Sequence, residues 1–102
     1  MEKLDENSFK SFTEKDKVIV DFWAEWCGPC KNLAPIYKEL SEEMEDVHFG
    51  KVNVDDHGEI AQENSVRGIP TMVLFEDGEE VDRIVGFVPK DQLRQKIETA
   101  FA

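Results

Sequence analysis

The chain contains only two cysteines, Cys27 and Cys30, which are separated by Gly28 and Pro29. Two thiols at this spacing can close a disulfide or supply half of a metal site. They come directly after the apolar run 18–23, so the first sulfur is expected where a strand ends and a helix begins. Unpaired backbone N–H groups and the helix dipole favour negative charge at that position. We therefore expect the pair to do chemistry rather than to fill space.

The two thiols are expected to differ in how readily they ionise and in how accessible they are. The thiolate is the attacking species in disulfide exchange, and Cys27 stands at the open end of the predicted helix. Cys30 falls on the apolar stripe of that helix, where desolvation favours the neutral thiol. Cys27 is therefore predicted to be the nucleophile and Cys30 the resolving thiol. Gly28 and Pro29 let the turn close at bonding distance, and because neither is charged, they favour a reducing pair over an oxidising one.

The elements that must position this pair follow from apolar periodicity. Strands are predicted near Lys3 and Leu4 and over residues 17–23, 47–54, 71–76 and 80–85; helices are predicted over residues 7–14, 29–45, 57–64 and 89–101. A helix between successive strands is typical of parallel pairing, whereas Asp77 and Gly78 predict an antiparallel hairpin. The prediction is an α/β fold with a mixed sheet of about five strands, helices on both faces and a single domain over residues 1–102. Pro35 is expected to kink the second helix.

Length and charge limit the possible functions. The 102 residues include 12 Lys and Arg against 23 Asp and Glu, which gives a formal net charge of -11. Such a surface repels phosphate backbones and anionic membranes, so we expect neither nucleic acid nor a membrane as a partner. No apolar run opens the chain and none is long enough to span a bilayer, so we expect no signal peptide and a cytoplasmic protein. In that compartment a cysteine pair is more often catalytic or metal-binding than structural.

Asp21 is the second chemical signal. Strand alternation puts it on the same face as Ile19 and Trp23, so its carboxylate is predicted to point into apolar surroundings, where burial raises its pKa. It either acts on the neighbouring dithiol or is a polar residue satisfied by a neighbour such as Lys51. Lys51, on the next predicted strand, either tunes Asp21 electrostatically or is an ordinary solvated lysine.

The run 20–31, with the sequence VDFWAEWCGPCK, resembles the active-site segment of the thioredoxin family. The similarity extends along nearly the whole chain. Further positions match the family in order: Asn53, Asp55, the run 67–71 and Gly86. A lone C-x-x-C would be weak, but these positions together are highly specific. The resemblance implies the thioredoxin fold.

The resemblance also implies roles for individual residues. In the family, the residue matching Asp21 assists deprotonation of the resolving thiol, here Cys30, through water or directly. The proline matching Pro70 is cis and lies beside the dithiol, although a generic X-Pro bond is mostly trans. The backbone of the preceding Ile69 is then left to pair with an extended substrate segment, which would explain broad substrate tolerance.

An apolar rim around the dithiol is expected to receive the substrate. Its expected members are Trp26, Ile69, Pro70, Val85 and Gly86, with Val54 and Val66 as further candidates. Valines at such positions are more often core than rim. Trp23 is expected to support the active turn from beneath.

The function that the resemblance implies is a protein-disulfide reductase. Cys27 attacks the substrate disulfide, Cys30 resolves the mixed disulfide, and a separate thioredoxin reductase, either a flavoprotein or a ferredoxin-linked enzyme, restores the dithiol. The expected partners are that reductase and disulfide-containing client proteins. No bound cofactor and no metal are expected, and the chain is expected to act as a monomer.

Three alternatives remain open from the residues. A metal or iron–sulfur site would need a second chain, because no further cysteine exists and His48 and His57 do not match a finger spacing. A redox-independent adaptor subunit is the second. A disulfide oxidase or isomerase is the third, and the uncharged spacer argues against it.

Overall fold

A five-stranded mixed sheet forms the middle layer of the computed structural model, which describes residues 1–102. The elements in chain order are β1 (Glu2–Lys3), α1 (Phe9–Thr13), β2 (Lys17–Trp23), α2 (Gly28–Glu43), β3 (His48–Asn53), α3 (Gly58–Glu63), β4 (Thr71–Glu76), β5 (Glu79–Val85) and α4 (Lys90–Ala100). The strand order is β1-β3-β2-β4-β5. The β1–β3 and β2–β3 pairs are parallel, and the β2–β4 and β4–β5 pairs are antiparallel. The expected α/β fold with a mixed sheet is confirmed.

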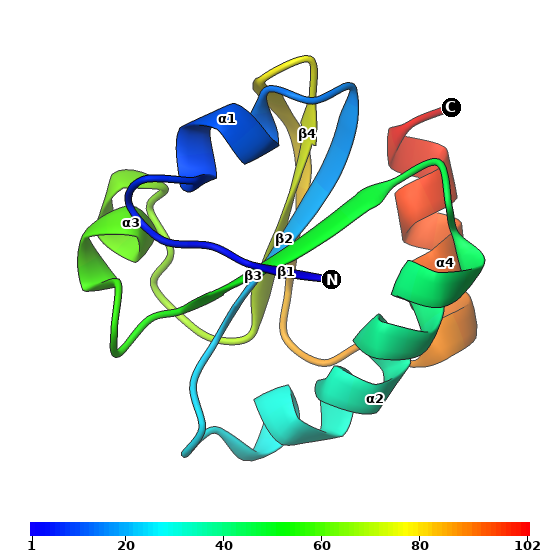
Figure 1. Cartoon of the computed structure of the whole chain (residues 1–102). Coiled ribbons are helices and arrows are strands. Elements are labelled where there is room, and N and C mark those ends of the chain that lie inside the picture. Colours follow the sequence, from blue (N-terminus) through cyan, green and yellow to red (C-terminus); the bar gives the residue numbers. More distant parts are fainter.

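Helices cover both faces of the sheet (Figure 1). Successive side chains of β2 point to opposite faces of the sheet. Ile19 packs with α2 and α4 on one face. The cluster on the other face, which includes residues of α1 and α3, contains Val18, Val20 and Phe22. All four side chains are fully buried. A strand with both faces covered requires a continuous apolar run, which is the pattern that the sequence carries here.

The hairpin between β4 and β5 turns at Asp77 and Gly78, as predicted. Both residues have positive φ, 53° and 90°, as a tight type I′ connection requires. The predicted element bounds differ from the observed ones by a few residues at most. Pro89 is the N-cap of α4 in an extended conformation, not a residue of its first turn, because its ψ is 156°.

The helix α2 carries the dithiol at its first turn. Its buried face includes Cys30, Leu33, Tyr37 and Leu40, which follow helical spacing as predicted. Pro35 lies inside this helix. The start of α2, the end of β2 and the loops after β3 and β5 meet at one end of the molecule (Figure 1).

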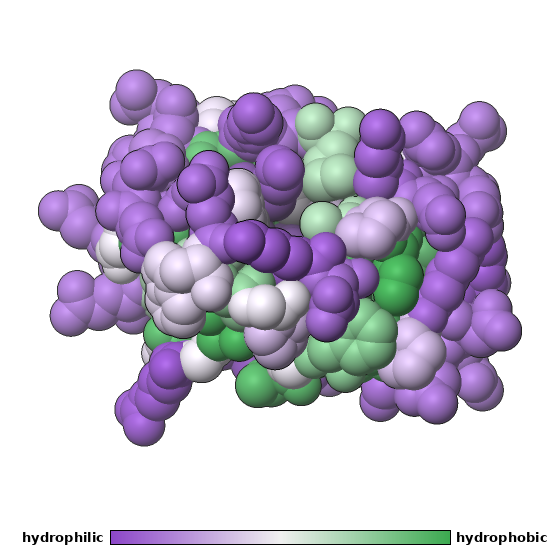
Figure 2. All heavy atoms as spheres, turned by 90° about the horizontal axis from the view of Figure 1, so that it is seen from below, coloured by the Kyte–Doolittle hydropathy of each residue, from purple (hydrophilic) through white to green (hydrophobic).

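That end presents apolar side chains to the surface. Figure 2, which views the molecule from below, shows green and white side chains over the middle of the face, with purple, hydrophilic ones around them and in a row across the centre. Large apolar side chains that are exposed in the loops and strand ends here are Trp26, Val85 and Phe87. None of the four helices combines the length and apolar character needed to cross a membrane.

Candidate active site

The two cysteines are joined in a disulfide across the first turn of α2. Their Cα atoms are 5.2 Å apart. Cys27 is the N-cap of the helix, with extended backbone, and Pro29 occupies the first turn after it. The backbone N–H of Cys30 points at Cys27 Sγ, at a distance of 3.2 Å. A sulfur at this position would be stabilised as a thiolate by that N–H group and by the helix dipole.

The sequence predicted an accessible Cys27 and a buried Cys30, but the exposed fractions of the two residues are nearly equal. Cys27 is 4% exposed and Cys30 is 3% exposed. The two residues differ instead in their surroundings. Cys27 Sγ lies 3.8 Å from the carbonyl oxygen of Ile69, on the side of the apolar loops, whereas Cys30 lines a small cavity together with Asp21. The direction in which each sulfur can be approached therefore separates them.

The cavity next to Cys30 is small and partly open to the surface, with a volume of about 70 Å³. Its lining includes Asp21, Trp23, Cys30, Tyr37 and Lys51. Asp21 is 4% exposed, and its Oδ1 atom has no hydrogen-bond partner in the protein. Burial raises the pKa of Asp21 to about 7, although the positive charge of Lys51 acts in the opposite direction. This carboxyl group can therefore both accept and release a proton near neutral pH.

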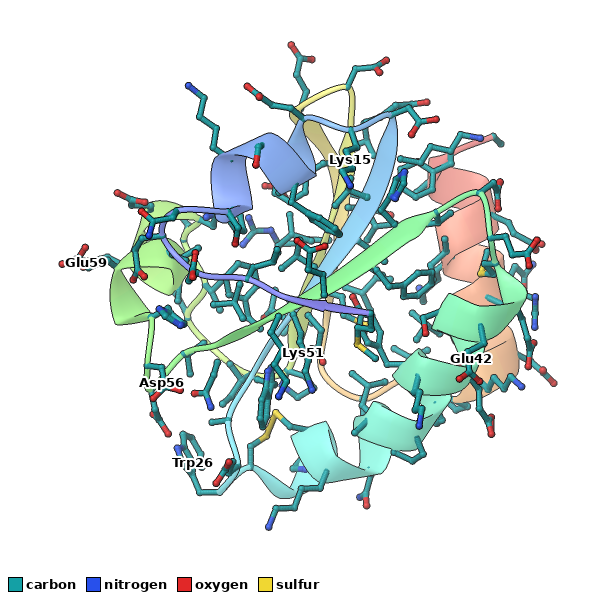
Figure 3. All side chains as sticks on the ribbon, viewed as in Figure 1. Lys15, Trp26, Glu42, Lys51, Asp56 and Glu59 are labelled. Atoms are coloured by element: carbon teal, nitrogen blue, oxygen red, sulfur yellow. A yellow bond between two sulfur atoms is a disulfide. The ribbon has the colours of Figure 1, made fainter.

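Lys51 stands beside Asp21 in the sheet, because the two residues are register partners of β3 and β2. Lys51 is half-buried, and its Nζ atom lies 4.8 Å from the ring centroid of Trp23. A cation over an aromatic face at this distance is attracted by the ring. Figure 3 shows Lys51 close to the yellow disulfide bond. Trp23 packs against the cluster of Ala24, Cys27 and Cys30, and its ring also contacts the lysine that pairs with Asp21 in the sheet.

The Ile69–Pro70 peptide bond is cis. Pro70 is buried, and Ile69 is half-buried beside Cys27. The carbonyl oxygen of Pro70 accepts a hydrogen bond of 2.8 Å from the backbone N–H of Gly86, which has a φ of 91°. Val85 is 68% exposed at the end of β5. These residues therefore come together at one edge of the dithiol, although they lie about 40 to 60 positions after it in the chain.

A mainly apolar pocket of about 350 Å³ lies on the other side of Ile69. Its lining residues are Trp26, Val54, Ala61, Val66, Arg67, Gly68 and Ile69. Val54 and Val66 are half-buried: they line this pocket and also pack against the core cluster that includes Phe22 and Val52. Trp26 is 70% exposed, and Figure 3 shows it at the tip of the loop before α2.

Sequence reasoning missed two features of this pocket. Trp26 Nε1 donates a hydrogen bond of 3.0 Å to Asp55 Oδ2, which anchors the indole. Arg67 and Ala61 line the pocket as well. No local pattern signals these contacts, because they join residues of separate loops and helices. The structure contains no group of three or more His, Cys, Asp or Glu side chains that could hold a metal ion.

The model of the thioredoxin family matches residues 1–99 of the chain. Thioredoxin of Chlamydia caviae is 51% identical over 86 residues, which cover 84% of this chain and 84% of the relative. Thioredoxin of Bacillus subtilis is 43% identical over 96 residues, which cover 93% of this chain and 92% of the relative. These relatives span nearly the same length as this chain.

Solved structures of thioredoxins share the fold. A mutant thioredoxin of Halobacterium salinarum aligns with a TM-score of 0.91 at 37% identity, covering 99% of this chain and 90% of the other. Thioredoxin of Malassezia sympodialis aligns with a TM-score of 0.90 at 37% identity, covering 100% of this chain and 91% of the other. The sheet order and the helices on its two faces are therefore those of the thioredoxin fold.

The intact Cys27–Cys30 pair and these relatives agree on the class of reaction. Family members are thiol-disulfide oxidoreductases, which act by dithiol–disulfide exchange. The chain belongs to the thioredoxin family and is a protein-disulfide reductase.

Proposed function

We propose that Cys27 is the attacking thiolate and Cys30 the resolving thiol when this chain reduces a client disulfide. The observation that carries this assignment is the contact of 3.2 Å between the Cys30 backbone N–H and Cys27 Sγ at the helix N-cap. An N–H group and a helix dipole both favour the thiolate at that sulfur. Cys27 Sγ also faces Ile69, beside which an extended client segment can lie. Gly28 and Pro29 support the turn that holds the two sulfurs together.

The proposed reaction has two exchange steps. The Cys27 thiolate attacks one client sulfur, a mixed disulfide forms, and the other client sulfur leaves as a thiolate. Cys30, once deprotonated, attacks Cys27 Sγ and releases the first client sulfur. The client gains two electrons and two protons, and the chain becomes the Cys27–Cys30 disulfide. A separate thioredoxin reductase, flavoprotein or ferredoxin-linked, then returns two electrons to the chain.

Asp21 is the proposed acceptor of the Cys30 proton. Both residues line the cavity of about 70 Å³, which has room for a water molecule that relays the proton. The pKa of Asp21, about 7, suits a group that must gain and lose a proton at neutral pH. Lys51 is the proposed electrostatic partner, since its charge keeps that pKa from rising further.

Clients are proposed to bind along the apolar rim. Ile69 offers its backbone for strand-like pairing beside the sulfur of Cys27, and Pro70 holds that segment against Gly86. Exposed Trp26 and Val85 supply apolar surface on either side. Recognition through backbone and apolar contacts would admit many sequences, as a general reductase needs.

The remaining parts of the proposal concern the whole chain. Residues 1–102 act as one domain and as a monomer in the cytoplasm, and the dithiol needs no additional cofactor. The pair of clusters on the two faces of one sheet supports a single folding unit. Neither nucleic acid nor a membrane is proposed as a partner, since the net charge of -11 opposes both.

Trapping of the mixed disulfide tests whether Cys27 attacks and Cys30 resolves. Cys30→Ser should accumulate covalent complexes with a disulfide-containing client, because the second exchange step is blocked. Cys27→Ser is the matched control and should form few complexes, because the remaining thiol of Cys30 lacks the N-cap contact that favours a thiolate and faces the cavity with Asp21 instead of the apolar loops. Reducing and non-reducing electrophoresis with mass spectrometry identifies the linked cysteine. Equal trapping by both variants, or a link through Cys30, would overturn the assignment.

A further inference from the structure

Residues 64–70, which connect α3 to β4, form a loop that depends on a side chain from another strand. This 64–70 loop carries Val66, Gly68 and Ile69, which line the apolar pocket beside Trp26. The loop runs from α3 toward the end of the molecule where α2 begins (Figure 1). Any change in its position therefore changes the surface next to Cys27.

Arg83 of β5 forms hydrogen bonds to the beginning of this loop. Its Nη2 atom donates a hydrogen bond of 2.9 Å to the carbonyl oxygen of Asn64, and its Nη1 atom donates one of 3.2 Å to that of Ser65. These carbonyl groups follow the end of α3, where the helix itself supplies no partner. A guanidinium group suits this task because its planar fork can bond two acceptors at once.

The backbone at the same point needs external support. Ser65 has a φ of 57°, a left-handed conformation that is uncommon for a residue with a Cβ atom. A backbone hydrogen bond of 2.9 Å from Val66 N to Ala61 O closes the helix end around it. The bonds from Arg83 hold the two carbonyl groups on either side of the unfavourable torsion angle.

Glu80 aims the guanidinium group at the loop. Its two carboxylate oxygens accept hydrogen bonds of 2.8 Å each from Nε and Nη2 of Arg83. Residues three apart in a regular strand point to opposite faces, but the β4–β5 register shifts between Leu74 and Phe75, so Val81 is an extra residue. This bulge turns Glu80 and Arg83 to the same side.

We propose that Arg83, aimed by Glu80, is a positioning residue for disulfide reduction, because it holds the 64–70 loop in the shape that receives client proteins. The proposal rests on the proposed binding of clients along the apolar rim. Neither residue touches the sulfurs, so the effect reaches the reaction only through the loop. A preformed loop saves the client the cost of ordering it on binding.

Steady-state kinetics with two kinds of disulfide test the proposal. With dithiothreitol as electron donor, Arg83→Ala should raise KM for insulin roughly three- to tenfold while kcat changes by less than about twofold. In single turnovers, the pre-reduced chain freed of dithiothreitol should reduce a small aromatic disulfide, which needs no groove, at the rate of the parent chain. Arg83→Lys should restore part of the loss, and Glu80→Gln should give a smaller rise in KM, since the carbonyl bonds remain.

A matched control is Arg94→Ala. Arg94 pairs with Glu43 on the surface between α2 and α4, and its side chain is 34% exposed against 28% for Arg83. This variant should leave both kinetic parameters unchanged. Hydrogen exchange adds a structural readout: the amides of residues 64–69 should exchange faster in Arg83→Ala than in Arg94→Ala.

Trp26→Ala separates failure of this inference from failure of the client rim. If Trp26→Ala raises KM for insulin and Arg83→Ala does not, the positioning role is overturned and the rim stands. If neither variant changes KM, the rim and the positioning role are both overturned. An equal loss of rate with insulin and with the small disulfide would also overturn the positioning role, because the substitution would then have impaired the dithiol itself.

Discussion

Asp21 is a carboxyl group that is buried although its ionised form is costly to bury. It is 4% exposed, its Oδ1 atom has no partner in the protein, and its only close register partner of opposite charge is Lys51. An ionised carboxylate in such a place is penalised by lost hydration. The same penalty brings its pKa to about 7, which is where a proton acceptor for Cys30 is useful.

The stability of the chain should therefore depend on pH through Asp21. The pKa is about 7 in the folded chain and about 4 in the unfolded chain, so the folded state binds more protons between these values. Stability should fall as pH rises from 4 to 7 and level off above. Relative to Asp21→Asn, the parent chain should lose roughly 4 kcal/mol of unfolding free energy across that window.

Urea unfolding at intervals from pH 4 to pH 8 measures this difference. Asp56→Asn, which alters an exposed carboxylate, is the matched control and should follow the parent chain. In the same pH range, release of the client from the mixed disulfide should lose its dependence on a group with a pKa near 7 in Asp21→Asn. A parallel stability profile for the parent and Asp21→Asn would contradict the assigned burial penalty.

Close packing around β3 decides how the elements meet. Tyr37 of α2 lies with its hydroxyl 3.1 Å from the carbonyl oxygen of Ile19 and 2.6 Å from that of Gly50, so this helix is tied to the seam between β2 and β3. On the other face, Phe12 of α1 packs against Gly50. Gly50 is thus enclosed by a helix on each side of the sheet.

Gly50→Ala should destabilise the fold. A Cβ atom there would lie 2.8 Å from Phe12 Cε2 and 2.9 Å from Leu4 Cδ1, and the backbone cannot retreat because Gly50 pairs with β1 and β2. Overpacking of this kind costs about 1–3 kcal/mol. Denaturant unfolding measures it, with Gly58→Ala as the control, since no atom lies within 4 Å of a Cβ atom there. Equal midpoints for the two variants would show that Phe12 moves aside freely.

The positions of the elements could be predicted well from the chain, and their contacts could not. The run 17–23 predicts β2 with its observed bounds, and helical spacing predicts the buried face of α2. The bulge at Val81 left no sequence signal, because it arises from the pairing of two strands and not from either strand alone. The hydrogen bonds from Arg83 to the 64–70 loop depend on that bulge, so they could not be predicted from the sequence either.

At the scale of the whole molecule, charge dominates the surface. A net charge of -11 on 102 residues repels a second copy, and the exposed apolar side chains are few. The Cα radius of gyration is 12.2 Å, close to the roughly 13 Å typical of a single folded chain of this length.

The chain should therefore be a monomer in solution. Sedimentation at moderate salt should give a mass near 11.7 kDa in both the oxidised and the reduced state. Because 1 M salt shortens the screening length to about 3 Å, a second run at that salt tests whether charge alone keeps the copies apart. A dimer that persists on dilution at moderate salt would contradict the expectation.

The sequence by itself determined the class of chemistry and the order of the elements, because both depend on neighbours along the chain. The spacing of Cys27 and Cys30, the helix start and the apolar strand before it are local features. Tertiary structure decided which distant groups meet: the carbonyl of Ile69 beside Cys27 Sγ, and Asp21 in one cavity with Cys30. It also decided that both sulfurs are nearly equally buried, against expectation. Burial and approach direction depend on how the sheet and helices pack, which no local pattern encodes.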